Sequence, residues 1–288
     1  MPKRLFNLTV SLLLSLWDWI HDHLLFLLGR KAPARGVVLA YHSVLPKERE
    51  LFAQQMDKLL QKATPVRADA ALLPTNTGRF VAVTFDDGLE SILENALPEL
   101  RKRSIPATLF IVTDMLGRGR DWEHLGGEDT RAEMVMTREQ LCALPLDLID
   151  IGSHSMSHPL LPKVSPEKMR EEMLGSKLKL EQMLNRKVKL FSFPYGGFNQ
   201  AVIDECKSAG YERAFTALPV FAYSTPGEFE TGRVSTHPTD WPLEYRMKLL
   251  GAYRWLPHAF QMKKRIKSLL KGKNFDARNA SKRQERAA

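Results

Sequence analysis

The feature that most constrains the fold is an alternation of short apolar runs with longer amphipathic stretches between residues 35 and 239. Short apolar runs bounded by turn residues indicate buried strands. Strands that alternate with helices build a parallel sheet, because each helix returns the chain to the same end of the sheet. The sequence therefore predicts an α/β fold, with the sheet either open or closed into a barrel. The predicted strands are Val37–Tyr41, Phe80–Phe85, Ala107–Val112, Leu148–Ile151, Val188–Phe193 and Arg213–Ala217.

Helix-start and helix-stop residues mark the stretches between these strands. Ser165 followed by Pro166 is typical of a capped helix start, and that helix is expected to run to about residue 184. Asn199 opens a later helix that Gly210 ends. In parallel sheets the chemistry gathers at the carboxyl ends of the strands, so polar residues directly after the predicted strands are the first candidates for a site.

Composition excludes several classes of protein. The chain has 288 residues, of which 44% are hydrophobic, which is enough for a sizeable core in one or two domains. Its two cysteines exclude a disulfide scaffold, and the absence of a Cys-x-x-Cys pair argues against a thiolate zinc site.

The positive charge is confined to the end of the chain. The segment from Tyr253 onward holds eleven Lys or Arg against two Asp or Glu, so it accounts for the whole formal charge of +9. A nucleic-acid enzyme carries its charge on the folded body, so no nucleic-acid partner is expected. Residues 243–288 are predicted as a basic amphipathic helix with a disordered tail, suited to an anionic membrane surface. Packing of the same helix on the domain, with a solvated basic face, is an equal alternative.

The amino-terminal segment, residues 1–34, predicts a second amphipathic helix. Its polar residues recur every three or four positions and form one narrow stripe, with apolar side chains covering the rest. Trp17 and Trp19 suit the headgroup level of a bilayer. We interpret the segment as a membrane-interfacial helix; a helix docked on the domain and an uncleaved signal anchor are the alternatives. Membrane association in a cell envelope is therefore expected, on a side the sequence leaves open. The stripe consists of Asn7, Ser11, Ser15, Asp18 and Asp22.

Three segments place polar groups directly after predicted strands. Asp86 and Asp87 follow the strand that ends at Phe85, and adjacent carboxylates are costly to bury unless they are paired or bind a metal. The alternative is a solvated Asp-Asp-Gly turn. His154 and His158, four residues apart after another strand, could face one ion. A third segment, Pro194-Tyr195-Gly196-Gly197, could present backbone N–H groups and an aromatic wall to a ligand, or could be a simple turn.

Taken together, these segments resemble the polysaccharide deacetylase family (carbohydrate esterase family four, the NodB-homology domain). The resemblance runs from about residue 38 to residue 234 and predicts a catalytic domain over residues 35–242. It implies a distorted (β/α) barrel with incomplete closure, flanked here by the two terminal amphipathic helices. The matching motifs are Tyr41-His42-Ser43-Val44, Thr84-Phe85-Asp86-Asp87-Gly88, His154-Ser155-Met156-Ser157-His158 and Phe193-Pro194-Tyr195-Gly196.

The resemblance also implies roles for individual residues. Asp86 corresponds to the catalytic base, and Pro194 and Tyr195 to the segment that binds substrate and the oxyanion through the Tyr195 N–H. The implied cofactor is a divalent metal, usually zinc, which leaves an open coordination position for water. Its implied ligands are Asp87, His154 and His158.

Two positions depart from the family pattern. Many members carry an Arg where this chain has Ser192, and Arg233 is the hypothetical replacement for that guanidinium. The general acid of the family is a His near the end of the domain, which makes His237 the candidate, although a surface-loop histidine is the alternative interpretation. His42 is another polar group expected near the site.

The predicted function is metal-dependent hydrolytic removal of N-acetyl groups from an amino sugar, in a cell-envelope polysaccharide or a lipid-linked glycan. The partner it implies is an N-acetylated glycan substrate. An O-acetyl esterase is an alternative that the same metal and base could serve. A membrane-bound glycan-binding module with a degenerate site is a second alternative, which the intact carboxylates and histidines argue against.

Overall fold

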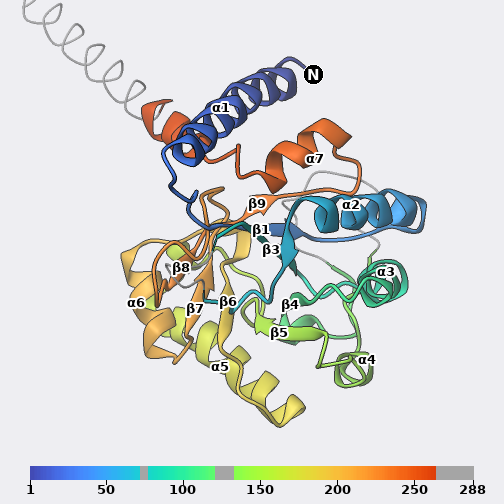
Figure 1. Cartoon of the computed structure of the whole chain (residues 1–288). Helices are drawn as coiled ribbons and strands as arrows, with labels where there is room; N and C mark the ends of the chain where they lie inside the picture. The colour runs from blue at the N-terminus through green and yellow to red at the C-terminus, as the bar shows by residue number, and fades with distance from the viewer. Residues whose placement is uncertain (72–76, 121–132, 264–288) are drawn as a thin grey trace, which may run out of the picture.

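A computed structural model describes residues 1–71, 77–120 and 133–263 of the chain (Figure 1). Its centre is a sheet with the strand order β8-β7-β6-β5-β4-β3-β1-β9, in which every neighbouring pair is parallel and the short β2 also pairs with β3. The strands are β1 (Arg35–Tyr41), β2 (Thr64–Pro65), β3 (Arg79–Phe85), β4 (Ala107–Ile111), β5 (Ile149–Ser153), β6 (Leu190–Ser192), β7 (Arg213–Phe215), β8 (Glu230–Thr231) and β9 (Val234–Ser235).

The sheet curls until its two ends almost meet. Strands β8 and β9 lie at opposite ends of the strand order, yet only Gly232 and Arg233 separate them in the chain. Within the described residues no hydrogen-bonded ladder joins these two strands, so the barrel closes incompletely. The predicted parallel α/β fold is confirmed, and the connection between β8 and β9 carries Arg233 to the point of closure.

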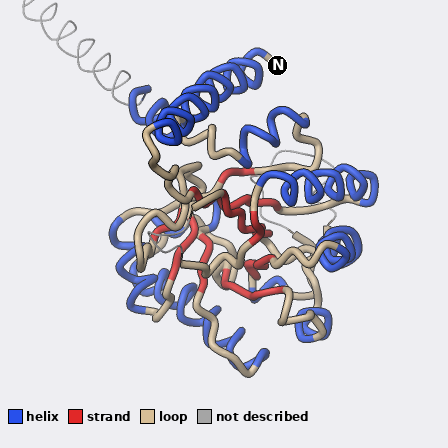
Figure 2. The backbone as a smooth tube through the Cα atoms, viewed as in Figure 1, coloured by secondary structure: helices blue, strands red, loops and turns tan. Residues whose placement is uncertain are grey.

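Helices cover the outside of the curled sheet (Figures 1 and 2). The Ser165 hydroxyl accepts from the Lys168 N–H at 3.3 Å, and the Asn199 side chain accepts from the Val202 N–H at 3.0 Å, so the predicted caps are confirmed. The α-helices are α1 (Pro2–Leu27), α2 (Arg49–Lys62), α3 (Leu97–Lys102), α4 (Arg138–Cys142), α5 (Pro166–Leu184), α6 (Gln200–Ser208) and α7 (Pro242–Leu249). Single helical turns occur at Pro46–Glu48, Ile92–Ala96, Thr113–Met115, Leu161–Lys163 and Pro194–Gly196.

The segment around α7 belongs to the packed domain. Tyr245, Leu249 and Tyr253 are buried, and α7 contacts α1, α2 and β1. The described segment that follows residue 242 therefore packs with the barrel as one unit, because these three side chains face the core. The predicted disordered tail from residue 275 lies outside the described residues.

Helix α1 lies beside α7 at the edge of the molecule (Figure 1), and Asp22 near its end pairs with Arg35 at the start of β1. Residues 256–263, also helical, lie beside it. Among the helices that the structure describes, none is long and apolar enough to cross a bilayer.

Candidate metal centre and active site

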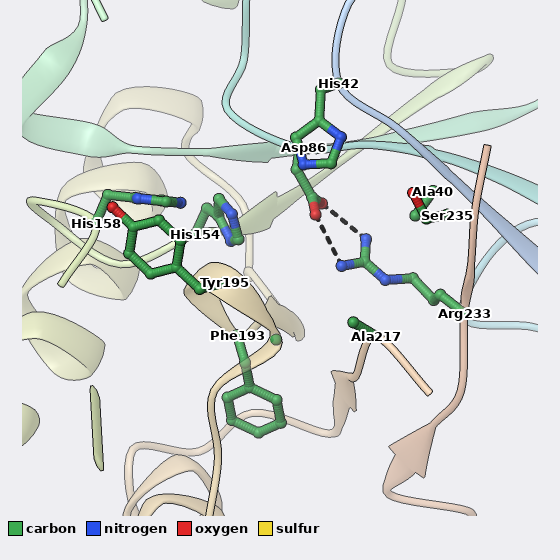
Figure 3. A pocket seen from close by; sticks show the side chains of 11 residues that line it. Ala40, His42, Asp86, His154, His158, Phe193, Tyr195, Ala217, Arg233 and Ser235 are labelled. Carbon is green, nitrogen blue, oxygen red and sulfur yellow. Dashed lines mark hydrogen bonds and ion pairs between the residues drawn. The ribbon is translucent and has the colours of Figure 1, made fainter. Parts of the chain in front are cut away.

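A pocket opens where the carboxyl ends of the strands converge (Figure 3). Its polar lining comes from segments that directly follow β1, β3, β5 and β6, from the connection between β8 and β9, and from Ser235 in β9. The three predicted strand-end segments therefore meet in one place, as expected for a parallel sheet. The lining residues are Ala40, His42, Asp86, His154, His158, Phe193, Tyr195, Gly196, Ala217, Arg233 and Ser235.

The turn after β3 directs its two carboxylates to different partners. The Asp86 N–H still donates to the Tyr41 carbonyl at 2.9 Å, as the strand pairing requires, and the backbone then turns sharply. Asp87 and Gly88 both adopt left-handed conformations, with φ of 72° and 70°. Asp tolerates this conformation, whereas a Cβ at Gly88 would in addition stand 2.8 Å from the Ile111 side chain. This turn in the backbone therefore directs the Asp86 and Asp87 side chains to different partners.

Asp87 and the two histidines form a compact, buried set of metal-ligating groups. The Asp87 Oδ1 lies 3.6 Å from Nε2 of both His154 and His158, and each of the three residues is at least 96% buried. Ligands about 2.0–2.1 Å from a tetrahedral ion stand roughly 3.3–3.5 Å apart, so the spacing fits one ion among them. The structure therefore brings the predicted metal ligands together.

Both histidines are prepared to act as neutral ligands. The backbone carbonyl of Ser192 lies 2.8 Å from Nδ1 of His154 and accepts the proton there, which leaves Nε2 with its lone pair facing Asp87. Burial, followed by the neighbouring His154, lowers the pKa of His158 to about 2, so its imidazole is uncharged near neutral pH. Neutral imidazole is the form that binds a metal.

The Asp87 carboxylate gives an independent indication that an ion fits here. Among the described residues, neither of its oxygens accepts a hydrogen bond, although both are buried. The nearest cationic group is the Arg120 guanidinium, 3.6 Å from Oδ2. A buried carboxylate without hydrogen bonds is costly, and a divalent cation is the group that would compensate it. One Asp oxygen and two imidazole nitrogens are a common donor set for catalytic zinc.

Asp86 makes a bidentate ion pair with Arg233 instead of facing the histidines. The Arg233 nitrogens donate to its two oxygens at 2.7 and 2.8 Å, and both side chains are almost fully buried (Figure 3). Burial, the largest single effect, raises the pKa of Asp86, but the Arg233 charge and hydrogen bonds together with His154 and His42 outweigh it and hold the pKa well below its usual range. Asp86 is therefore an anion inside the pocket, with no metal-ligating role in this arrangement.

Ser192 leaves the space that Arg233 fills. The Ser192 hydroxyl accepts from the second Arg233 nitrogen at 2.7 Å, and the Arg233 guanidinium carbon lies 5.4 Å from the centre of the Phe110 ring. The resemblance implies a guanidinium at the position of Ser192. In this chain a guanidinium comes instead from Arg233, in the connection between β8 and β9. The structure brings Arg233 to the place where the sequence hypothesis put it.

His237 does not reach the pocket. Its side chain is 55% exposed, and its Nδ1 lies 2.7 Å from the Thr239 hydroxyl. The chain turns outward after β9, where the His237 carbonyl accepts from Gln55 on α2, and this turn carries the imidazole away from the metal ligands. His42 lines the pocket instead, beside Asp86 (Figure 3). The role predicted for His237 therefore has no support in the geometry, because its imidazole and Asp86 do not share a cavity.

Tyr195 and Pro194 occupy the turn that ends β6. Tyr195 has a left-handed backbone, with φ of 57°, and its ring lies edge-on to His158 with the ring centres 4.4 Å apart. The Gly196 N–H closes the turn by donating to the Phe193 carbonyl at 2.9 Å. The turn therefore places Tyr195 at the pocket, with its aromatic ring against one of the metal ligands.

Glu172 on α5 is a functional candidate that the sequence did not indicate. Its buried carboxylate accepts from the N–H groups of Met156 and Ser157, both at 2.8 Å, and from the Ser157 hydroxyl at 2.6 Å. These bonds hold the turn between the two histidines, in which His158 has a left-handed backbone with φ of 61°. Glu172 therefore positions the histidine pair without touching the ion site.

Replacing Glu172 with Gln is expected to weaken zinc binding by about 10–100-fold, because outer-shell groups of this kind set the orientation of the ligands. A Gln side chain keeps the shape but loses the charge and one acceptor. Zinc affinity by isothermal titration measures the effect. Glu171→Gln, at an exposed neighbouring position, is the matched control and should bind zinc like the wild type. Equal affinity in both variants would contradict a positioning role.

Comparison with known proteins places this architecture among named relatives. The family model described as "Polysaccharide deacetylase" matches residues 74–214. YxkH of Bacillus subtilis is 27% identical over 219 residues, covering 72% of this chain and 73% of its own. The poly-beta-1,6-N-acetyl-D-glucosamine N-deacetylase of Staphylococcus epidermidis is 29% identical over 147 residues, and the chain spans 48% of that relative's length.

Solved structures match the fold over most of the chain. IcaB from Ammonifex degensii superposes with a TM-score of 0.63 and 26% identity, covering 75% of this chain and 97% of its own. The Streptococcus pyogenes deacetylase PplD has a TM-score of 0.62 and 21% identity, covering 76% and 99%. The curled parallel sheet is therefore an architecture that solved deacetylases share.

Proposed function

Because this chain belongs to the polysaccharide deacetylase family, whose members are hydrolases that act on amide bonds, we propose that it removes N-acetyl groups from an amino-sugar glycan with the help of a divalent metal. One observation carries the proposal. A buried set of metal-ligating groups, Asp87 with His154 and His158, lies in the same pocket region as an ionised carboxylate that is not part of it. This is the pair of functions that amide hydrolysis by an activated water requires.

Asp87, His154 and His158 would hold the ion, and zinc suits this donor set. When bound, a divalent cation supplies Lewis acidity to an acyl carbonyl and makes a water molecule more acidic. Asp86 accepts the proton of the attacking water. Because Arg233 holds both Asp86 oxygens, the carboxylate is fixed in orientation and ionised before substrate arrives.

Tyr195 and His42 carry out the two remaining steps, which are stabilisation of the oxyanion and protonation of the leaving amine. The Tyr195 N–H donates to the oxyanion that develops as the carbonyl carbon becomes tetrahedral. The leaving amine must be protonated, because an amide anion is too poor a leaving group at neutral pH. His42 is the imidazole that lines the pocket next to Asp86, and we assign it this proton transfer in place of His237.

The paired variants His42→Phe and His237→Ala separate the two candidates for the acid. We expect His42→Phe to lower kcat by at least about 10²-fold, since proton transfer to the leaving group is lost. His237→Ala should leave kcat near the wild-type value, because that side chain is exposed outside the pocket. Acetate release at saturating substrate measures both. A large loss in His237→Ala with an active His42→Phe would reverse the assignment.

The names of the relatives support a proposal for the substrate class. Several of them are named poly-beta-1,6-N-acetyl-D-glucosamine N-deacetylases, although the chain spans only about half of their length. A β-1,6-linked N-acetylglucosamine oligomer is therefore the first substrate to test, and a lipid-linked N-acetylated sugar is the second. The proposal places the reaction in a cell envelope, where such glycans are assembled.

The test incubates the metal-stripped protein and the zinc-loaded protein with these oligomers and measures released acetate. Zinc-loaded protein is expected to release acetate and free amines in equal amounts, and chelation should abolish the release until zinc is restored. An O-acetylated glycan in a parallel reaction identifies an esterase. No acetate from any N-acetylated glycan, with zinc bound at Asp87 and the two histidines, would refute the proposal.

A further inference from the structure

Helix α1 has the reverse of the usual polarity for a helix on a protein surface. Such a helix normally buries an apolar stripe and exposes polar residues. Here the polar stripe faces the domain, where the Asp18 carboxylate accepts two hydrogen bonds from Arg254, at 2.6 and 2.9 Å. Asp22 accepts two from Arg35, at 2.7 and 2.8 Å. The attachment of α1 is therefore largely polar.

Further contacts along the helix fix its rotation about its own axis. Near the start of α1, Arg4 donates to Glu244 on α7 at 2.7 Å, and its guanidinium lies 4.2 Å from the centre of the Trp241 ring. Midway, the buried Ser11 hydroxyl accepts from the Trp255 indole N–H at 3.1 Å. Because polar contacts hold α1 at its start, middle and end, its opposite side is held facing away from the domain (Figure 1).

That opposite side is a broad apolar surface, which we call the apolar arc. At 100° per residue its positions span roughly 160° of the helix circumference. None of them is Asp, Glu, Lys or Arg, and all are exposed, with Leu13 at 64%, Trp17 at 65% and Trp19 at 62%. The arc consists of Leu5, Phe6, Thr9, Leu12, Leu13, Leu16, Trp17, Trp19, Ile20, His23, Leu24 and Leu27.

The width of the arc argues for lipid as its occupant. A second helix covers a narrow seam of about two positions in seven, so a copy of α1 would leave most of the arc in water. A bilayer interface covers a whole face of a helix lying in its plane. Trp17 and Trp19 carry indole rings suited to the headgroup level. A contiguous apolar surface of this kind on a soluble domain marks an interaction site.

The charges beside the arc indicate the kind of lipid. Lys3 precedes it and Arg30 with Lys31 follow it, all exposed. Residues 256–263 are helical and directly follow Trp255, which contacts α1, and Lys263 among them is exposed. The sequence beyond them holds nine Lys or Arg against two Asp or Glu. Basic residues next to an apolar helix face complement anionic headgroups.

We propose that the apolar arc of α1 docks on the surface of a bilayer containing anionic lipid. The helix lies in the interfacial plane, and its ion pairs with Arg35 and Arg254 attach the barrel to it. The membrane thus becomes a binding partner of the chain in addition to any glycan. This inference does not depend on the proposed deacetylation, because no residue of the arc lines the pocket.

The test is cosedimentation of the full chain with vesicles of three parts phosphatidylethanolamine to one part phosphatidylglycerol. The variant Leu13→Gln/Trp17→Gln/Ile20→Gln replaces three exposed apolar residues midway along the length of the arc. Its control, Leu60→Gln/Leu174→Gln/Leu178→Gln, removes three exposed leucines elsewhere on the surface. The arc variant is expected to bind at least about tenfold more weakly than the wild type, and the control to bind like the wild type.

Because the substituted side chains are exposed, the arc variant should keep the far-UV circular dichroism and thermal midpoint of the wild type. Light scattering of the vesicle-free protein gives its mass. A wild-type chain that stays in the supernatant, or an arc variant that sediments as well as the wild type, would overturn the proposal. A dimer that the arc variant dissociates, together with no vesicle binding, would assign the arc to a second copy instead.

Discussion

Replacing Asp86 with Asn is expected to lower kcat for acetate release by about 10²–10⁴-fold while zinc binding persists. The amide has nearly the shape of the carboxylate but cannot accept the proton of the attacking water. The variant leaves the three metal-ligating side chains in place. Asp86 itself pairs with Arg233 and not with the histidines, so its replacement should not disturb the ion site. The measurements are kcat at saturating glycan and zinc content per chain.

The neighbouring variant Asp87→Asn is the matched control for this result. It changes the same chemical group one residue along, but removes the only carboxylate within reach of both imidazoles in the described residues. We expect it to lose zinc and activity together, whereas Asp86→Asn loses activity alone. If Asp86→Asn keeps kcat within a few fold of the wild type, Asp86 is not the base, and a group elsewhere in the pocket must accept the proton.

The contrast between these two aspartates shows how far strand ends can be predicted from the sequence. A buried apolar run followed by polar residues marks the carboxyl end of a strand, and the parallel topology then brings such ends together. This logic brought the segments that hold Asp87, His154 and His158 to one edge of the sheet, and the resemblance to the deacetylase family then implied these three as ligands; the predicted strand bounds agree closely with the structure. Strands β2 and β8 escaped prediction, because two residues are too few for a periodicity.

Residues whose role depends on the path of a loop were harder to predict. His237 lies two residues after β9, so its sequence position resembles that of a strand-end residue. The turn that follows, at Pro238, points it to solvent, which agrees with the alternative interpretation of His237 as a surface-loop histidine. Glu172 was missed for a different reason. A charged residue at this position of α5 is common in helices. The importance of Glu172 comes from the hydrogen bonds that its carboxylate accepts from the backbone between His154 and His158.

Removing the guanidinium of Arg233 is expected to affect both stability and catalysis. In Arg233→Met a buried carboxylate loses its only bidentate partner among the described residues, and breaking such a pair costs about 3–5 kcal/mol. The guanidinium then no longer opposes the effect of burial on the pKa of Asp86, so the carboxyl becomes protonated at a higher pH than in the wild type. The acid limb of the kcat profile should therefore move to higher pH. Urea unfolding and pH–rate profiles measure the two effects.

The stability difference should also depend on pH in a defined direction. In the wild type the folded-state pKa of Asp86 lies below its unfolded value, so its ion pair stabilises fully above about pH 4 and less as the pH falls through the folded-state pKa. The gap between Arg233→Met and the wild type should thus be widest near neutrality and narrow in acid. Metal-free protein is used for these unfolding curves, so that zinc binding does not enter the comparison.

The double variant Arg233→Met/Asp86→Asn tests whether the cost arises from the unpaired charge. With both charges gone, the buried site holds an amide and a thioether, and much of the lost stability should return, because no isolated ion remains in the core. Activity should stay low, since the base is absent. A double variant as unstable as the sum of the two single variants would mean that Arg233 acts through its packing against Phe110 and Phe215, and not through its charge on Asp86.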